Sequence, residues 1–191
     1  MNELFPIFLK LDRLNTLVVG GGNVALEKVS ALLRNSPTAR VTMVAPMFRE
    51  ETLVFLMDYA QVEILERGFE LSDLEGRDLV ICATDNRALH EGIKEACSQQ
   101  HLLCNVADTP DLCDFYLGSI VKKGDLKIAI STNGKSPTMA KRIRGFLEDV
   151  IPEEIQESLE GMEAVRKTLK GDFQAKIQAL NELTKDLIFR K

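Results

Sequence analysis

A glycine-rich segment near the start of the chain has the residue types and the spacing of a phosphate-binding turn. Residues 20–25 read Gly-Gly-Gly-Asn-Val-Ala, and they follow the apolar run 16–19 and precede a helical pattern. In such a unit Gly20 permits a tight turn, Gly22 lets the backbone approach a pyrophosphate, and Ala25 allows close helix packing. The helix N-terminus attracts the phosphates. The segment therefore predicts a dinucleotide site, with a packed glycine turn that binds no ligand as the alternative.

Two polar side chains follow later apolar runs, at the sheet edge where open α/β folds place their ligands. Thr84 ends one run, and we expect it near the cofactor. Asp108 ends the next, and its carboxylate is expected to act as a general base or to hold a cationic substrate nitrogen. The alternatives are that Thr84 or Asp85 caps the following helix, and that Asp108 belongs to a turn before Pro110.

The chain has no acidic residue after the second apolar run, where a ribose-binding carboxylate is expected. Residues 45–49 read Ala-Pro-Met-Phe-Arg. We expect backbone groups of Pro46 and Met47 to contact the adenosine half of the cofactor. Arg49 fits a 2′-phosphate, or it is a solvated surface charge. The residues themselves therefore leave the choice between NAD and NADP open.

The cysteines and histidines do not have the spacing of a metal site. The cysteines at 82, 97, 104 and 113 include no C-x-x-C pair, and the chain has 2 histidines. We expect reduced thiols, with Cys82 and Cys104 in the core and Cys113 without a role in a polar loop. His90 and His101 lie near the two ends of one predicted helix and are expected at the surface. No metal site is therefore predicted.

The first part of the chain alternates short apolar runs with helical patterns. The runs are rich in leucine and β-branched residues, and they cover 16–19, 41–45, 62–65, 78–83 and 102–106. Apolar residues recur at helical spacing from Val24 to Leu33 and from Asn86 to Gln100. This alternation predicts an α/β fold, a Rossmann-type doubly wound parallel sheet of five strands.

After Asp108 the pattern changes. Two extended runs, 115–121 and 126–131, are joined by Lys-Lys-Gly-Asp and predict a small antiparallel hairpin. Helices are expected from Ser136-Pro137 onward, then over 155–169 and 173–188. We expect a dinucleotide-binding domain over 1–113, a dimerisation and substrate-facing region over 114–150, and a helical region over 151–191. The protein is accordingly predicted to be a homodimer.

The composition is that of a folded globular protein. The chain has 191 residues, of which 45% are hydrophobic and 28% charged, and its formal net charge is −5. This charge disfavours nonspecific nucleic-acid binding and favours small-molecule partners. The sequence starts without a basic, apolar leader, and it has no run of about 18 apolar residues. We therefore expect a cytoplasmic protein with no membrane span.

Several of these motifs together resemble one family. They are Pro6–Leu9, Gly20–Ala25, Ala83–Asp85, Asn105–Asp108 and Ile128–Pro137. Over residues 5–152 the chain closely resembles the precorrin-2 dehydrogenase module of siroheme synthases. The resemblance implies a Rossmann domain, a dimerisation region, and NAD-dependent oxidation of precorrin-2 to sirohydrochlorin. Some members of the family also insert Fe²⁺, and methylation of the substrate would need another protein.

The resemblance also implies roles for single residues. By motif position, the cofactor would be held by Gly20, Gly22, Asn23, Val24, Pro46 and Met47. Asp108 would be the catalytic acid or base, and Asn105 would line the same site. The chain departs from the family at Thr132 and Asn133, where Ser or Gly is common, and at Leu117-Gly118-Ser119. The first departure weakens any inference about a phosphorylated serine, and the second alters the expected substrate wall.

A basic rim is expected to help capture a polycarboxylate substrate such as precorrin-2. Its residues are Lys122, Lys123, Lys135, Lys141, Arg142 and Arg144. The alternative is that the helical members form only a solvated face. Two other functions stay open at this point: a dinucleotide-sensing regulatory module without catalysis, and a ferrochelatase that keeps the cofactor fold. Asp108 and the segment Ser131–Pro137 favour an enzyme, because a sensor has no chemical need for them.

Overall fold

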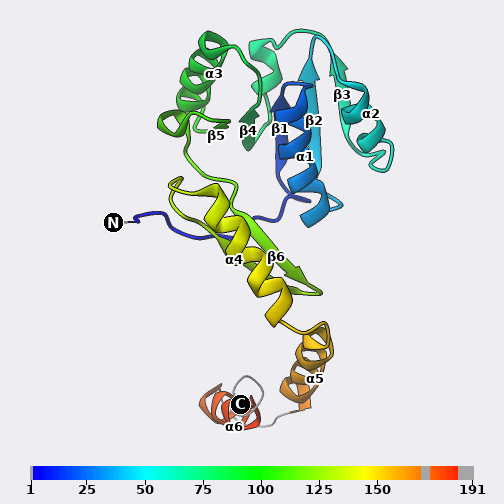
Figure 1. The fold of residues 1–191 in the computed structure, drawn as a ribbon, viewed down its shortest axis with the longest axis vertical. Coiled ribbons are helices and arrows are strands. Elements are labelled where there is room, and N and C mark those ends of the chain that lie inside the picture. Colours follow the sequence, from blue (N-terminus) through cyan, green and yellow to red (C-terminus); the bar gives the residue numbers. More distant parts are fainter. Residues whose placement is uncertain (1, 169–172, 185–191) are drawn as a thin grey trace. The chain divides into compact units, whose positions relative to one another are not determined.

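The computed structural model describes residues 2–168 and 173–184, and the chain forms two compact units, residues 1–117 and 118–191. The first unit contains five strands, which are β1 (Asn15–Val19), β2 (Arg40–Ala45), β3 (Glu63–Glu66), β4 (Leu79–Cys82) and β5 (Leu103–Val106). All neighbouring pairs are parallel, and the order is β3-β2-β1-β4-β5 (Figure 1). The predicted five-stranded parallel sheet is confirmed.

Helices link these strands. They are α1 (Asn23–Asn35), α2 (Glu50–Leu56) and α3 (Arg87–Gln99), with 3₁₀ turns η1 (Leu71–Leu74) and η2 (Pro110–Leu112). The helix α2 was not predicted, because its 7 residues are too few to show a clear apolar period. The strand order reverses at β1, which pairs with both β2 and β4. Open α/β sheets bind their ligands at such a reversal, outside the carboxyl ends of the strands.

Strands β1, β2, β4 and β5 are buried on both faces of the sheet, and successive side chains of each strand point to opposite sides. On one face Val18 and Met43 pack with Val29 of α1 and with Leu56 of α2. On the other face a second cluster packs on α3, and it contains Leu17, Val19, Val80, Cys82, Ile93, Cys97 and Cys104. Helices thus cover both faces, which confirms the doubly wound architecture.

The second unit begins with an antiparallel ribbon of β6 (Ser119–Lys123) and β7 (Leu126–Ile130). Gly124 has φ 56° in the two-residue turn between them, a conformation that favours glycine. The helix α4 (Pro137–Val150) packs on β6 and begins at Ser136, whose hydroxyl accepts a hydrogen bond from the Met139 backbone N–H at 3.1 Å. The predicted hairpin is confirmed, although residues 115–118 lie outside its strands.

Two further helices follow, α5 (Ile155–Thr168) and α6 (Phe173–Thr184). They confirm the predicted helices over the described part, and residues 169 and 185–188 of those predictions lie outside the described residues. Among the helices of 2–168 and 173–184, none combines the length and the apolar character of a membrane span.

Candidate functional site

The Gly-rich turn between β1 and α1 requires glycine at position 20. Gly20 has φ +132°, and a Cβ atom added there would lie 2.3 Å from the carbonyl oxygen of Ala83. Its backbone N–H donates to the carbonyl of Val44 at 2.9 Å. The turn is thus held between the carboxyl ends of β2 and β4.

Gly21 has a structural role that was not predicted from the sequence. A Cβ atom added to Gly21 would lie 2.3 Å from the carbonyl oxygen of Met47. The Gly21 carbonyl accepts hydrogen bonds from the Arg49 backbone N–H at 3.0 Å and from the Thr52 hydroxyl at 3.1 Å. The second glycine therefore fixes the segment after β2 against the turn. The sequence signal for this role was a third glycine inside the motif, between Gly20 and Gly22.

Gly22, in contrast, faces open space. No atom lies within 4 Å of a Cβ added to this residue, although it forms the N-cap of α1. It supplies no side chain to cap the first backbone N–H groups of the helix, and the first turn contains no acidic residue. A helix N-terminus of this kind attracts an anion. The turn therefore leaves room for a phosphate at the place where the sequence predicts one.

The residues around this opening are exposed. Asn23, Pro46 and Met47 are exposed, and Val24 is 37% exposed. The guanidinium of Arg49 donates from Nη1 to Oδ1 of Asn23 at 2.7 Å. The segment after β2 and the start of α1 are thus joined beside the turn, so the predicted cofactor residues of these two elements lie together.

At the end of β4, Thr84 is held by a buried histidine. His90 is 5% exposed, and its Nε2 lies 2.8 Å from the Thr84 hydroxyl and 3.3 Å from the Thr84 backbone nitrogen. The prediction of a surface His90 is therefore wrong. His90 precedes Ile93 by three residues and Cys97 by seven, so it belongs to the apolar stripe of α3. Burial lowers the pKa of His90, and the charge of Asp85 opposes this shift.

Neither Thr84 nor Asp85 caps the helix α3. The N-cap is Asn86, whose Oδ1 accepts a hydrogen bond from the Leu89 backbone N–H at 3.0 Å. Thr84 instead accepts from the Asn86 backbone N–H at 3.2 Å. The side chain of Asp85 is exposed. Capping is therefore excluded as the explanation for Thr84.

The loop after β5 is closed by two side chains. Asn105 is 5% exposed, and its Nδ2 donates to the carbonyl of Phe115 at 2.7 Å. The thiol of Cys113 accepts from the Val106 backbone N–H at 3.2 Å and lies 3.1 Å from the Val106 carbonyl. Cys113 therefore has a positioning role that the sequence analysis did not expect. Asp108, exposed between these anchors, has φ 55°, a left-handed conformation that Asp tolerates better than most residues.

A salt bridge adds a third anchor to this loop. Nζ of Lys94, in α3, lies 2.5 Å from Oδ1 of Asp114. The other carboxylate oxygen of Asp114, Oδ2, accepts a hydrogen bond from the Cys104 backbone N–H at 2.9 Å. Both side chains are partly shielded from solvent. The loop is thus fixed to the helix as well as to the strand.

The sheet register brings the predicted residues to one edge. Val19 of β1 pairs with Cys82 of β4, which pairs with Val106 of β5. The three strands therefore end at the same level, and Gly20, Thr84 and Asp108 follow those ends. The open N-terminus of α1 at Gly22, here called the phosphate cradle, lies along the same edge as the Thr84 hydroxyl and the Asp108 carboxylate. This combination suits dinucleotide binding and a proton transfer.

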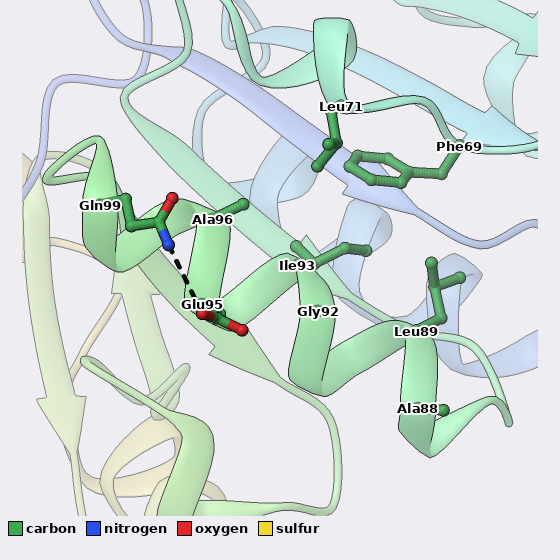
Figure 2. A pocket seen from close by; sticks show the side chains of 9 residues that line it. All are labelled: Phe69, Leu71, Ala88, Leu89, Gly92, Ile93, Glu95, Ala96 and Gln99. Carbon is green, nitrogen blue, oxygen red and sulfur yellow. Dashed lines mark hydrogen bonds between the residues drawn. The ribbon is translucent and has the colours of Figure 1, made fainter.

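The residues of the sheet edge do not line the pocket that lies beside α3. A pocket of about 480 Å³ lies between α3 and the segment at Phe69 and Leu71 (Figure 2). Its lining is mostly apolar, and Glu95 is its one titratable residue. We place the candidate site at the sheet edge, because that edge has the phosphate cradle and the carboxylate. In the described residues, no group of three or more His, Cys, Asp or Glu side chains is placed to hold a metal ion.

Comparison with known proteins agrees with this geometry. Residues 7–119 match a family model described as "Putative NAD(P)-binding", and residues 123–149 match one described as "Sirohaem biosynthesis protein central". A siroheme synthase of Thioalkalivibrio sulfidiphilus is 43% identical over 150 residues, which are 78% of this chain and 30% of that protein. A siroheme synthase of Pseudoalteromonas atlantica is 40% identical over 171 residues, 90% of this chain and 36% of that protein.

The chain thus spans about a third of the length of these relatives. Among solved structures, SirC, a precorrin-2 dehydrogenase, has a TM-score of 0.74 at 24% identity and covers 98% of this chain and 90% of its own. That similarity supports the fold. The family model covers more than half of the chain, including the Gly-rich turn and all five strands of the sheet. The chain belongs to the NAD(P)-binding family.

Proposed function

We propose that the chain uses NAD to oxidise precorrin-2 to sirohydrochlorin, a step of siroheme synthesis. The observation behind the proposal is that the open phosphate cradle at Gly22 and the carboxylate of Asp108 share one sheet edge. The chain that has this edge is similar to siroheme synthases and has the fold of a precorrin-2 dehydrogenase.

The residues at the turn fit a dinucleotide. The backbone at Gly22 would admit the pyrophosphate, and the first turn of α1, with Asn23 and Val24, would bind it through backbone N–H groups. The exposed backbone of Pro46 and Met47 would contact the adenosine half. A bound nicotinamide supplies the hydride acceptor. Thr84 and Asn105 would lie beside the nicotinamide. Thr84 would present its hydroxyl, and Asn105 would hold the loop that follows β5.

Asp108 would move the proton of the reaction. Oxidation of the macrocycle breaks a C–H bond whose electron pair leaves as hydride, and the macrocycle loses a proton as well. The Asp108 carboxylate would accept this proton and pass it to solvent, because the side chain is exposed. Its fixed left-handed backbone, closed on both sides by Asn105 and Cys113, would hold the carboxylate in one direction.

We propose NAD rather than NADP as the cofactor. Arg49 is the cationic side chain that follows β2, and its guanidinium is bound to Asn23 at the start of α1. A guanidinium used in this way is less available to a 2′-phosphate. Residues 45–49 contain no carboxylate to bind the ribose hydroxyls, and a carboxylate there would favour NAD further. We therefore expect only a moderate preference for NAD.

We further propose a cytoplasmic homodimer that uses its second unit for association and substrate capture. The helix α4 exposes an apolar stripe, in which Met139 is 50%, Ile143 38%, Phe146 64% and Val150 59% exposed. A second copy could cover this stripe. Of the expected basic rim, Lys123 pairs with Glu153 and Arg144 with Glu148. The exposed members, Lys122, Lys135, Lys141 and Arg142, would bind substrate carboxylates.

An anaerobic absorbance assay tests the function. Purified protein is mixed with precorrin-2 and NAD, NADP or neither, and Fe²⁺ is added afterwards as a further substrate. We expect sirohydrochlorin only with a dinucleotide, and faster with NAD. Dinucleotide binding without oxidation would contradict the proposal and favour the regulatory module. If iron insertion into supplied sirohydrochlorin were then accelerated, the chain would be a chelatase. The mass in solution separately tests the homodimer.

A further inference from the structure

The contacts of His90 determine which of its ring nitrogens has the proton. Nε2 receives a hydrogen bond from the backbone N–H of Thr84 at 3.3 Å. A backbone N–H can only donate, so this contact points to Nε2 as the unprotonated nitrogen of a neutral ring. The proton of the ring is accordingly on Nδ1.

This assignment also fixes the hydroxyl of Thr84. With Nε2 as an acceptor, the contact of 2.8 Å between Nε2 and Thr84 Oγ1 is a bond donated by the hydroxyl, which shares the single lone pair of Nε2 with the backbone N–H. The same oxygen accepts from the Asn86 backbone N–H at 3.2 Å. A hydroxyl has one donor and two acceptor positions. Thr84 therefore has one acceptor position left and no donor.

Thr84 lies next to the phosphate cradle. It directly follows Ala83, whose carbonyl oxygen limits the space at Gly20 and whose backbone N–H donates to the Val19 carbonyl at 2.8 Å. We infer that His90 is a positioning residue of the dinucleotide site, holding Thr84 so that its hydroxyl accepts a hydrogen bond from a ribose hydroxyl or the carboxamide of the cofactor. The inference rests on the proposed dinucleotide function.

The inference predicts the direction of a pH effect. Protonation of Nε2 would place a hydrogen against the Thr84 backbone N–H, and the arrangement would be lost. Burial lowers the pKa of His90 from its ordinary value of about 6.5. The neutral form therefore predominates above that range, and cofactor affinity should fall as the pH drops through the lowered pKa.

Few other charges act on the ring. Asp85 is the charged side chain that raises the His90 pKa, and β4 and β5, with sequences LVIC and LCNV, contain no charged residue. The charged side chains of α3 and η1 have partners nearby, which are Arg87 with Glu91, Lys94 with Asp114, Glu95 with Gln99 and Asp73 with Arg67. The pH effect should thus follow His90 itself.

The first test is the tautomer of His90. The chain contains 2 histidines, so ¹⁵N-labelled His101→Gln protein shows His90 alone. We expect the ring nitrogen shifts of a neutral ring with the proton on Nδ1 at neutral pH. A proton on Nε2, or a charged ring at neutral pH, would overturn the inference.

The second test is NAD binding by calorimetry between pH 5 and 8. The unaltered chain and the matched control His101→Gln should lose affinity on acidification, about fivefold or more, as expected for one hydrogen bond. His90→Gln keeps an acceptor near the Nε2 position but does not titrate, so its affinity should change little with pH. His90→Leu should bind about fivefold more weakly at neutral pH. Thermal melts of each variant monitor folding.

The outcomes separate the inference from the proposed function. If the unaltered chain binds NAD but its affinity is independent of pH, or if His90→Gln follows the same pH curve as His101→Gln, the inference is wrong and the cofactor site stands. If it binds no dinucleotide at any pH, both are wrong. ADP-ribose, which lacks the carboxamide, distinguishes the two donors: an equal pH effect assigns the ribose, and a lost effect assigns the carboxamide. Both results support Thr84 as the acceptor.

Discussion

The Gly-rich turn after β1 and the loop after β5 leave the same edge of the sheet, yet different forces hold them. In the turn the packing of main chain on main chain sets the shape, since Cβ atoms added to Gly20 or Gly21 would lie 2.3 Å from carbonyl oxygens. In the loop, side chains set the shape, because Asn105 and Cys113 bond to the backbone on both sides of Asp108. Adding side-chain atoms should therefore disrupt the turn, whereas removing polar side-chain atoms should disrupt the loop.

The difference suits the two tasks. A phosphate is bound by backbone N–H groups, so the turn needs a close approach of main chain to ligand. A carboxylate that transfers a proton needs a fixed direction, so the loop needs anchors that do not occupy the carboxylate. Substitutions in the turn and in the loop test this difference.

The largest effect is expected for Asp108→Asn. Asn tolerates the left-handed backbone and keeps the side-chain shape, but it cannot accept the proton. We expect kcat for precorrin-2 oxidation to fall by about 10²- to 10⁴-fold, with NAD affinity unchanged. Stopped-flow absorbance and calorimetry measure the two quantities. Undiminished turnover would remove Asp108 from the mechanism.

Gly22→Asp should separate binding from stability. Asp is a favoured N-cap, and nothing lies within 4 Å of the added Cβ, so stability should hold or rise by up to about 1 kcal/mol. The added charge would repel the pyrophosphate, and NAD affinity should fall on the order of 100-fold. A denaturant melt and a binding titration check both parts, and normal affinity would contradict the cradle.

Gly20→Ala should damage the fold itself. The added Cβ would overlap the Ala83 carbonyl, and φ +132° is unsuited to alanine. We expect a loss of roughly 3 kcal/mol in the free energy of unfolding. Gly92→Ala, in α3 with open space around its Cβ, is the matched control and should be neutral or stabilising. Equal melts for the two variants would show that the turn does not depend on this contact.

Cys113→Ala should loosen the loop and leave the turn intact. Removal of the thiol leaves the Val106 backbone N–H without its acceptor, at a cost of about 1 to 2 kcal/mol. We expect kcat to fall while NAD affinity stays within about twofold. Cys113→Ser keeps a donor and an acceptor and should recover part of kcat. A larger loss of NAD affinity than of kcat would reverse the proposed division of roles.

The smallest effect is expected for Arg49→Ala. Its hydrogen bond to Asn23 is exposed, so its loss should cost little stability, and the proposed NAD contacts do not involve the guanidinium. The ratio of NAD to NADP affinity should change by less than about twofold. A large gain or loss of NADP affinity would show that the guanidinium meets a 2′-phosphate after all.

The comparison also explains what could be predicted from sequence. The turn depends on residue types that few other structures require, so Gly20, Gly22 and the strand before them were identifiable. Strands β1, β2, β4 and β5 were predictable because buried parallel strands are continuous apolar runs, whereas the edge strand β3 is mostly exposed and contains two glutamates. The short α2 and the role of Gly21 depend on contacts with segments distant in the sequence. Such contacts produce no periodic pattern of apolar residues in the local sequence.

The loop and the histidine are held by contacts between a side chain and a backbone group six to ten residues away in the sequence. Cys113 reaches back to Val106, and a thiol in a polar loop gives no sign of this. His90 was expected at the surface because it lies near one end of the predicted helix, yet its position on the apolar stripe of α3 was visible in the spacing to Ile93 and Cys97. Position on the stripe was the better guide than position near the end of the helix.

The buried thiols of the α3 side offer a practical consequence. Cys82, Cys97 and Cys104 come from β4, α3 and β5 and lie in one core cluster, and all are free cysteines. A hydrogen bond with the Cys82 thiol, together with burial, raises the pKa of Cys104 to about 12, and the pKa of Cys97 is also raised. Thiolates are the reactive form, so these sulfurs should resist alkylation until this side of the sheet opens. The rate at which a thiol reagent labels these three cysteines would therefore measure the opening of this side of the sheet.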